Sequence, residues 1–249
     1  MGDHLLRFNG RDDRELVSDI AEYVADGLRP HQCAIVIAIE AHRIALVEEL
    51  ERRGRDTSRE IARGRLTLLD AEESLSRFMR NRRPDSERFY QHVGALLQNK
   101  LKRRKYRHVR VYGEMVGLLW ESRRFRAAYA LEDLWNGLQQ EFAFSLYCGY
   151  PIDVFDRQFK LRCVEPLFCA HTHVSPTDRS ARLELALERA AGELLGVRRA
   201  DLRAGAGTML REGWARVPNA EAEILWLREA HPRFADTVIE SAKGYFERT

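Results

Sequence analysis

The first 150 residues alternate between short, continuous apolar runs and longer segments of mixed polarity. Continuous runs that are rich in β-branched residues predict strands covered on both faces, as in a parallel sheet. We expect strands at Leu5–Phe8, Cys33–Ile39, Arg65–Asp70, His108–Tyr112 and Phe144–Cys148. What lies between these strands then decides the fold class.

The intervening segments have apolar residues three or four positions apart, which is the spacing of one helix face. Asp12 or Asp13 stands where the first of these segments begins and can cap it. The predicted helices cover residues 13–28, 41–53, 71–80, 86–105, 114–121 and 125–141. Strands that alternate with helices predict an α/β fold, with a mostly parallel sheet and helices on both of its faces.

The pattern changes near Ser175 and Pro176, and beyond them it predicts helices alone. These helices are expected at residues 178–195, 201–213, 219–228 and 232–248. We therefore expect an α/β domain over residues 1–175 and an all-helical module over residues 176–249. An apolar stripe in the first helix of that module must be buried against the α/β domain or in another copy of the chain, and we expect self-association, most simply as a homodimer. The stripe consists of Leu183, Leu187, Ala190, Ala191, Leu194 and Leu195.

Composition narrows the class of protein. Hydrophobic residues make up 45% of the 249 residues, which is enough for a buried core and excludes a disordered chain. No apolar run reaches the roughly 18 residues of a transmembrane helix, and the amino-terminal residues lack the apolar core of a signal peptide. We therefore expect a cytoplasmic protein whose four cysteines are free thiols.

The charge balance gives little indication of a nucleic-acid partner. Lys and Arg number 41 and Asp and Glu number 38, for a net charge of +3. The dense basic run at residues 100–107 is typical of a solvated helix end, with contact to nucleic acid or to an acidic partner as the alternative. We expect neither nucleic acid nor membrane among the partners.

Motifs that bind nucleotides are absent from the sequence. Such proteins have a Gly-rich loop after an early strand, because backbone N–H groups must approach the phosphates. The strand at Cys33–Ile39 is followed instead by Glu40-Ala41-His42-Arg43, whose carboxylate would repel phosphate. GxSxG, HExxH and CxxC motifs are absent as well. We expect a protein that is not an enzyme and has no cofactor.

Several short motifs occur in a specific order. They are HLLRF at 4–8, GRLTLLDA at 64–71, VYGEMV at 111–116, LEDLW at 131–135 and SLYCGYP at 145–151. In this order they resemble the MEDS domain, the methanogen/methylotroph DcmR-type sensory domain, over about residues 4–175. The resemblance implies a RecA/KaiC-like sheet that has lost its phosphate loop, in a signalling protein that senses small hydrocarbon derivatives. The chain departs from the family pattern at Asn9, where an aromatic residue is common, and at Pro30-His31, where Gly is usual.

Two functions remain open. The first is a sensor domain that binds a small molecule and relays the signal to the helical module or to a partner protein in a signalling pathway. The second is an interaction or scaffold protein, such as a component of a transcription regulator. A cavity behind Trp120 and Trp135 favours the sensor, whereas a broad apolar surface on the helical module favours the scaffold.

The ligand site is expected at the carboxyl ends of the central strands, where the βα turns of a parallel sheet meet. Glu114 and His42 are the expected polar anchors, and Gly113 is expected to let the backbone approach closely. Trp120 and Tyr150 are expected to supply an apolar wall. The expected ligand-binding residues are Glu40, His42, Gly113, Glu114, Trp120, Glu132, Trp135, Tyr147, Cys148 and Tyr150, with no metal among them.

These residues also have structural interpretations. Glu114 can cap a helix N-terminus and Glu132 can pair with an Arg, since a buried carboxylate needs a partner. The aromatic residues can belong to the core. A separate group can bind Zn²⁺ by its chemistry, although its spacing matches no standard zinc motif and inert thiols are the alternative. This group consists of Cys163, Cys169, His171 and His173.

Overall fold

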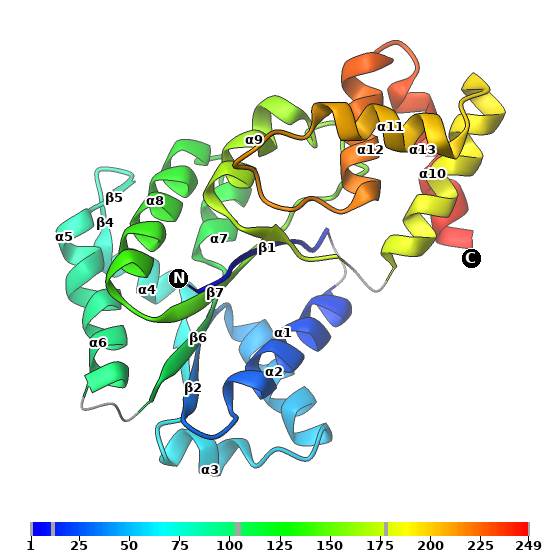
Figure 1. The fold of residues 1–249 in the computed structure, drawn as a ribbon. Helices are drawn as coiled ribbons and strands as arrows, with labels where there is room; N and C mark the ends of the chain where they lie inside the picture. The colour runs from blue at the N-terminus through cyan, green and yellow to red at the C-terminus, as the bar shows by residue number, and fades with distance from the viewer. Residues whose placement is uncertain (1, 11–12, 103–105, 177–178, 249) are drawn as a thin grey trace. The chain divides into compact units, whose positions relative to one another are not determined.

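The computed structural model describes residues 2–10, 13–102, 106–176 and 179–248 (Figure 1). The chain divides into two compact units, Met1–Pro151 and Ile152–Thr249. The domain boundary expected near residue 175 therefore falls inside the second unit, and it stays a prediction.

The first unit is built on a sheet whose neighbouring strands are all parallel. Its strands lie in the order β3-β2-β6-β7-β1, so the first strand of the chain is far from the second. Their bounds are β1 (His4–Phe8), β2 (Gln32–Ala38), β3 (Leu66–Asp70), β6 (His108–Gly113) and β7 (Phe144–Tyr150). All strands predicted in this part of the chain are present, and the predicted α/β fold with a parallel sheet is confirmed.

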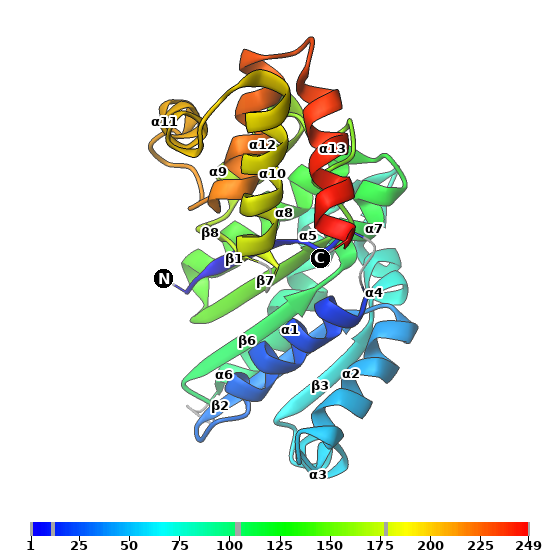
Figure 2. The same ribbon diagram turned by 90° about the vertical axis from the view of Figure 1, so that its right-hand side faces the viewer.

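Helices cover both faces of this sheet (Figures 1 and 2). On one face, α1 (Asp13–Gly27) and α2 (Glu40–Arg52) pack on alternate residues of β2 and on Tyr112 and Tyr147. On the other face, α8 (Phe125–Glu141) packs its Trp135 against Phe144 of β7. The remaining helices of this unit are α3 (Thr57–Ala62), α4 (Ala71–Phe78), α5 (Ser86–Phe89), α6 (Ala95–Leu101) and α7 (Met115–Glu121).

Three local features differ from the sequence prediction. A short hairpin of β4 (Met79–Arg80) and β5 (Arg83–Pro84) ends α4 earlier than expected, and α3 lies in a segment for which no helix was predicted. The helix that begins at Ser86 contains a π-helical turn, Tyr90–Gly94, between α5 and α6. Its expected end near Lys105 lies outside the described residues.

The turn before β2 contains the departure from the family pattern at Pro30-His31. His31 has a φ of 64°, which is the left-handed region that Gly adopts without strain. The Gly that the resemblance implies at Pro30-His31 would adopt this backbone conformation without strain.

The second unit is mainly helical. Its elements are α9 (Leu161–Ala170), β8 (His173–Val174), α10 (Ser180–Leu195), α11 (Arg199–Met209), α12 (Asn219–Ala230) and α13 (Ala235–Arg248). Helix α10 packs on α12 and α13, and α11 packs on α12. The close approach of α11 requires Gly205, since a Cβ there would lie 2.2 Å from the Trp226 ring.

The packing of α10 bears on the expected dimer. Leu183, Leu187, Ala190 and Ala191 of the predicted stripe are buried, whereas Leu194 is 47% exposed. Because α12 and α13 pack on α10 within one chain, the stripe gives no separate argument for a second copy. Self-association therefore stays a prediction.

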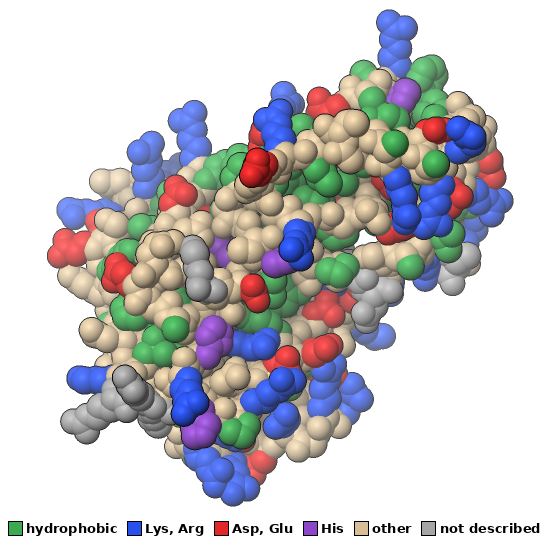
Figure 3. All heavy atoms as spheres, in the orientation of Figure 1, with side chains coloured by type: hydrophobic (Ala, Val, Ile, Leu, Met, Phe, Trp, Pro, Cys, Tyr) green, Lys and Arg blue, Asp and Glu red, His purple; other side chains and the backbone are tan. Residues whose placement is uncertain are grey.

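Charged side chains of both signs are interspersed on the face shown in Figure 3. Among the described residues, several charged side chains form pairs within one helix, such as Arg52 with Glu49 in α2 and Arg189 with Glu193 in α10. Among the described residues, no helix has the length and apolar character to cross a membrane. Part of the basic run at residues 100–107 lies outside the described residues; within it, Lys100 donates to the Gly64 carbonyl.

Candidate functional site

A cavity of about 310 Å³ opens at the carboxyl ends of β1, β2, β6 and β7 in the first unit. This is the low end of the size range of small-molecule sites, and it lies at the edge where parallel sheets bind ligands. Its lining residues are Asn9, Gly10, Asp13, Leu16, Ile39, His42, Tyr112, Glu114, Gly117, Leu118, Glu121, Gly149 and Pro151. We call this cavity the His42 pocket.

Glu114 is the polar centre of the pocket. It follows the last residue of β6 and is only 7% exposed. One carboxylate oxygen accepts the Ile39 N–H at 2.8 Å, and the other accepts the Tyr112 hydroxyl at 2.8 Å. Glu114 thus caps a helix, but the helix is α2, which begins after Ile39, and not α7, which follows Glu114 in the chain. Glu114 therefore caps α2 and lines the pocket at the same time.

His42 lies in the first turn of α2, between two carboxylates. Its Nδ1 is 2.5 Å from the second oxygen of Glu114, and its Nε2 is 3.5 Å from Asp13 of α1. The hydrogen bond with Glu114 raises the pKa of His42 above its ordinary value, and Asp13 acts in the same direction against the opposing effect of burial. An imidazole in this position can exchange a proton with a bound molecule.

Two glycines shape the pocket. A Cβ at Gly117 would lie 2.7 Å from the Gly149 carbonyl oxygen, and a Cβ at Gly149 would lie 2.6 Å from the Tyr112 hydroxyl. These positions let α7 approach the end of β7. A Cβ at Gly113 would meet no protein atom within 4 Å, and Gly113 is not among the lining residues of the pocket. The close approach of its backbone to a ligand stays a prediction.

The predicted site residues do not form one group. His42 and Glu114 line the pocket, whereas Glu40 is an exposed residue at the start of α2. Tyr147 packs between Tyr23 and Tyr112 in the core beneath α1. Trp120 and Trp135 pack edge-on against other aromatic rings and are not among the residues that line the His42 pocket. A cavity behind them stays a prediction.

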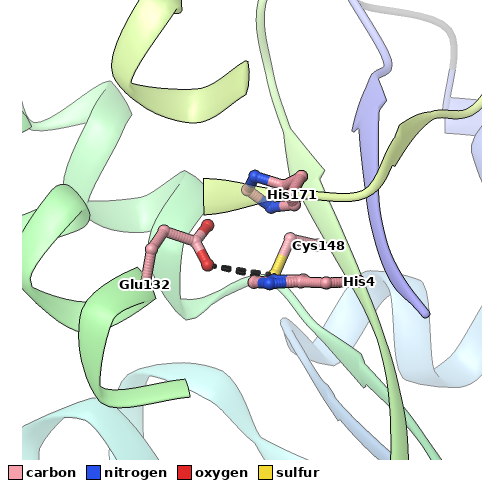
Figure 4. Close-up of side chains that lie close together, drawn as sticks. All are labelled: His4, Glu132, Cys148 and His171. Carbon is pink, nitrogen blue, oxygen red and sulfur yellow. Dashed lines mark hydrogen bonds and ion pairs between the residues drawn. The ribbon is translucent and has the colours of Figure 1, made fainter. Parts of the chain in front are cut away.

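The other predicted residues lie on the opposite face of the sheet, toward α8. There the Tyr150 hydroxyl donates to Glu132 Oε1 at 2.6 Å, and the Cys148 Sγ lies 3.6 Å from Glu132 Oε2. His4 of β1, which was not predicted, joins them with its Nε2 3.2 Å from Glu132 Oε2 (Figure 4). We call His4, Glu132 and Cys148 the His4 cluster.

The His4 cluster is almost completely buried. The exposed fraction is 1% for His4 and Glu132 and 0% for Cys148. Burial, followed by the neighbouring Glu132 carboxylate, raises the pKa of the Cys148 thiol well above its ordinary value. A His, a carboxylate and a thiol are also the donor types that bind transition metals.

The alternative metal group in the second unit is not assembled. Among the residues that the structure describes, no three of Cys163, Cys169, His171 and His173 lie close enough to share an ion. His171, which is also labelled in Figure 4, has its Nδ1 2.7 Å from the Leu167 carbonyl oxygen. Cys169 is exposed.

The residues that sequence reasoning missed have partners far along the chain. Asp13 was noted only as a possible helix cap, although it also faces His42. Nothing near His4 in the sequence indicates a cluster with Glu132 and Cys148, since their proximity depends on β1 pairing with β7. Alternation along β7 is the one signal available, because it predicts that Cys148 and Tyr150 share a face.

The sequence was compared with models of protein families and with curated proteins. A family model described as "MEDS: MEthanogen/methylotroph, DcmR Sensory domain" matches residues 3–172. No curated protein matches this chain.

Proposed function

This chain belongs to the MEDS family of sensory domains, and on that premise we propose that it is a non-enzymatic sensor that binds a small hydrocarbon derivative in the His42 pocket. The observation on which the proposal depends is the cavity itself, where a partly buried imidazole pairs with the buried carboxylate of Glu114 at the carboxyl edge of a parallel sheet.

The lining of the pocket supports the class of ligand. Leu16, Leu118 and Pro151 offer apolar surface, while His42 offers a polar group that can donate or accept a hydrogen bond beside it. A small molecule with an apolar body and one hydrogen-bonding group satisfies both kinds of surface. Glu114 already accepts hydrogen bonds from Ile39 and Tyr112 and contacts His42, so we assign it to holding His42 in place.

The position of the pocket also supports a relay. Its walls include the first turns of α1 and α2 and a turn of α7, which are separate elements of the first unit. A ligand that contacts all three favours one arrangement of these helices over others, and its differential affinity sets the size of the shift. We propose that this shift is passed to the helical C-terminal region or to a partner protein in a signalling pathway.

Ligand-observed NMR on the full chain tests the proposal, with a panel of short alcohols, ketones and halogenated hydrocarbons as probes. We expect at least one probe to show saturation transfer. Leu118→Phe, which fills the pocket, is expected to abolish the signal, while Leu185→Phe on the exposed surface of α10 is the matched control. Binding that survives Leu118→Phe and His42→Ala would place the ligand elsewhere and contradict the proposal.

The interaction protein is the second function that the sequence leaves open. If the chain is an interaction protein, no probe shows saturation transfer to the wild type, and neither Leu118→Phe nor Leu185→Phe changes that result. The same NMR panel therefore separates the two functions.

A further inference from the structure

The His4 cluster forms a triangle of three metal-binding atoms. His4 Nε2 lies 3.2 Å from Glu132 Oε2 and 3.4 Å from Cys148 Sγ. The third side, from Cys148 Sγ to Glu132 Oε2, is 3.6 Å. Each residue takes part in its two distances through the same atom: Nε2 of His4, Oε2 of Glu132 and Sγ of Cys148. The three side chains therefore converge on one point (Figure 4).

These distances are those of ligands around tetrahedral zinc. With ordinary zinc–ligand bond lengths, a nitrogen and an oxygen ligand lie about 3.3 Å apart, and a sulfur ligand lies about 3.5 Å from either. Each side of the His4 triangle agrees with these values to within about 0.2 Å. We propose that His4 Nε2, Glu132 Oε2 and Cys148 Sγ bind one Zn²⁺ ion, with a fourth group completing the tetrahedron.

The residues around the cluster hold the ligands in the required form. His4 Nδ1 lies 2.9 Å from Asn136 Oδ1, which can only accept, so Nδ1 has the proton. In the neutral ring Nε2 then has the lone pair that a metal needs, and a hydrogen bond from the other ring nitrogen is usual for a zinc-bound His. On Glu132, the Tyr150 hydroxyl occupies Oε1 and leaves Oε2 toward His4 and Cys148.

Burial gives a physical reason for an ion at this point. A neutral His4 would direct its Nε2 lone pair at the Glu132 carboxylate, and two acceptors at this distance repel each other in a low-dielectric interior. Zn²⁺ replaces this repulsion by two coordinate bonds. Cys148 binds as the thiolate, so its S–H bond breaks and one proton leaves to solvent when the metal binds. An imidazolium–carboxylate pair beside a neutral thiol is the arrangement that a metal-free protein would have.

The proposal is independent of the proposed function. The His4 cluster faces α8, whereas the His42 pocket opens on the other side of β7, and the two share no residue. Zinc at the His4 cluster would join β1, β7 and α8, so its loss is expected to lower stability whether or not the His42 pocket binds a ligand.

Metal analysis of the full chain is the first test. The protein is expressed in zinc-supplemented medium, so that the ion enters during folding, and is purified without chelators. Elemental analysis is expected to find about one Zn²⁺ per chain. A folded protein with no bound metal would overturn the proposal and favour the imidazolium–carboxylate pair.

Cobalt substitution identifies the ligands. Protein expressed with Co²⁺ in place of Zn²⁺ is expected to show a thiolate-to-cobalt charge-transfer band in the near ultraviolet. The variant Cys33→Ser/Cys163→Ser/Cys169→Ser, which keeps Cys148 as its only cysteine, should retain the band and the metal. Cys148→Ser should lose the band and bind the metal at least about 100-fold more weakly.

The two cysteine variants together keep the test decisive. If Cys148→Ser fails to fold, the spectrum of the triple variant still decides whether Cys148 binds the metal. A band that disappears in the triple variant and persists in Cys148→Ser would assign the thiolate to another cysteine and overturn the proposal. Far-ultraviolet circular dichroism checks that each variant is folded.

Discussion

The carboxylate of Glu114, at the end of β6, accepts the backbone N–H of Ile39 at 2.8 Å, at the start of α2. In a nucleotide-binding protein of this architecture a phosphate occupies that position, because a helix N-terminus attracts an anion. Here the protein supplies its own anion from a neighbouring strand. The residues Glu40-Ala41-His42-Arg43, which replace a phosphate loop, thus begin a helix whose N-terminus is already capped.

The first prediction is that Mg-ATP does not bind. A phosphate group would have to displace the Glu114 carboxylate and would meet Asp13 and Glu121 in the same pocket. Isothermal titration calorimetry of the full chain with Mg-ATP should give no binding heat. Micromolar affinity, lost on addition of EDTA, would show that this interpretation of the pocket is wrong.

The second prediction concerns the titration of His42. Because the Glu114 hydrogen bond is the largest cause of the raised pKa of His42, Glu114→Gln should lower that pKa toward its ordinary value. NMR titration of the His42 ring protons measures it. His92 serves as the internal control, since burial and Arg77 lower its pKa and Glu114 has no part in that shift.

The same pair affects stability. A His whose folded pKa is raised stabilises the fold fully below its unfolded pKa, and this contribution disappears as pH rises through the folded pKa. His42→Ala should therefore cost more stability at pH 6 than at pH 9, by about 1 kcal/mol for one charge-assisted hydrogen bond. Equal losses at the two pH values in urea unfolding would contradict the assignment.

The third prediction compares two glycines. Gly117→Ala places a Cβ against the Gly149 carbonyl oxygen, a backbone atom that cannot move aside cheaply, and should destabilise the protein by about 2 kcal/mol. Gly113→Ala is the matched control and should change stability by less than about 0.5 kcal/mol, because its Cβ has open space. Chemical denaturation of both variants decides whether the approach of α7 to β7 depends on Gly117.

The fourth prediction concerns Glu223 in α12 of the second unit. Burial, followed by the nearby Glu184 carboxylate, raises the pKa of Glu223 to about 7. The native state therefore holds a proton that the unfolded state has released, and stability falls as pH rises from about 4.5 through about 7. Glu223→Gln removes the ionisation and should make the protein more stable than the wild type by up to about 3 kcal/mol at pH 8, with little gain at pH 4.5.

The control for Glu223 is Glu229→Gln, at an exposed position of the same helix. It should leave the pH dependence of the urea midpoint unchanged. A wild-type midpoint that does not fall between pH 5 and pH 8 relative to Glu223→Gln would rule out the raised pKa.

Local sequence was sufficient for much of the fold. The continuous apolar run of β2 and the helical spacing of Leu16, Ile20 and Val24 in α1 each depend only on which residues of that element are buried. Both elements are present, and these residues are buried. The place of His42 and Glu114 followed from the rule that βα turns of a parallel sheet meet at one edge. The open space beside Gly113 could not be derived from the sequence, because the space around a glycine depends on residues that are distant along the chain.

The composition of the His4 cluster could not be derived from sequence. His4 and Cys148 are in contact only because β1 inserts beside β7, and many strand orders are compatible with the same pattern of strands and helices. Glu132 was recognised as an unusual carboxylate, but its partners are Tyr150 and His4 from two different strands. The sequence indicated that Glu132 is a buried carboxylate but did not show which residues surround it.

Successive side chains of β7 point to opposite faces of the sheet, so the strand contributes residues to two different sites. Tyr147 and Gly149 face α1 and the His42 pocket, while Cys148 and Tyr150 face α8 and the His4 cluster. Deleting or inserting one residue in this strand would exchange the two sets, burying a thiol beside Tyr112 and removing it from His4 and Glu132. An insertion or deletion in β7 would therefore disrupt both sites, whereas a substitution changes only one side chain. We expect natural variants of this strand to differ by substitutions.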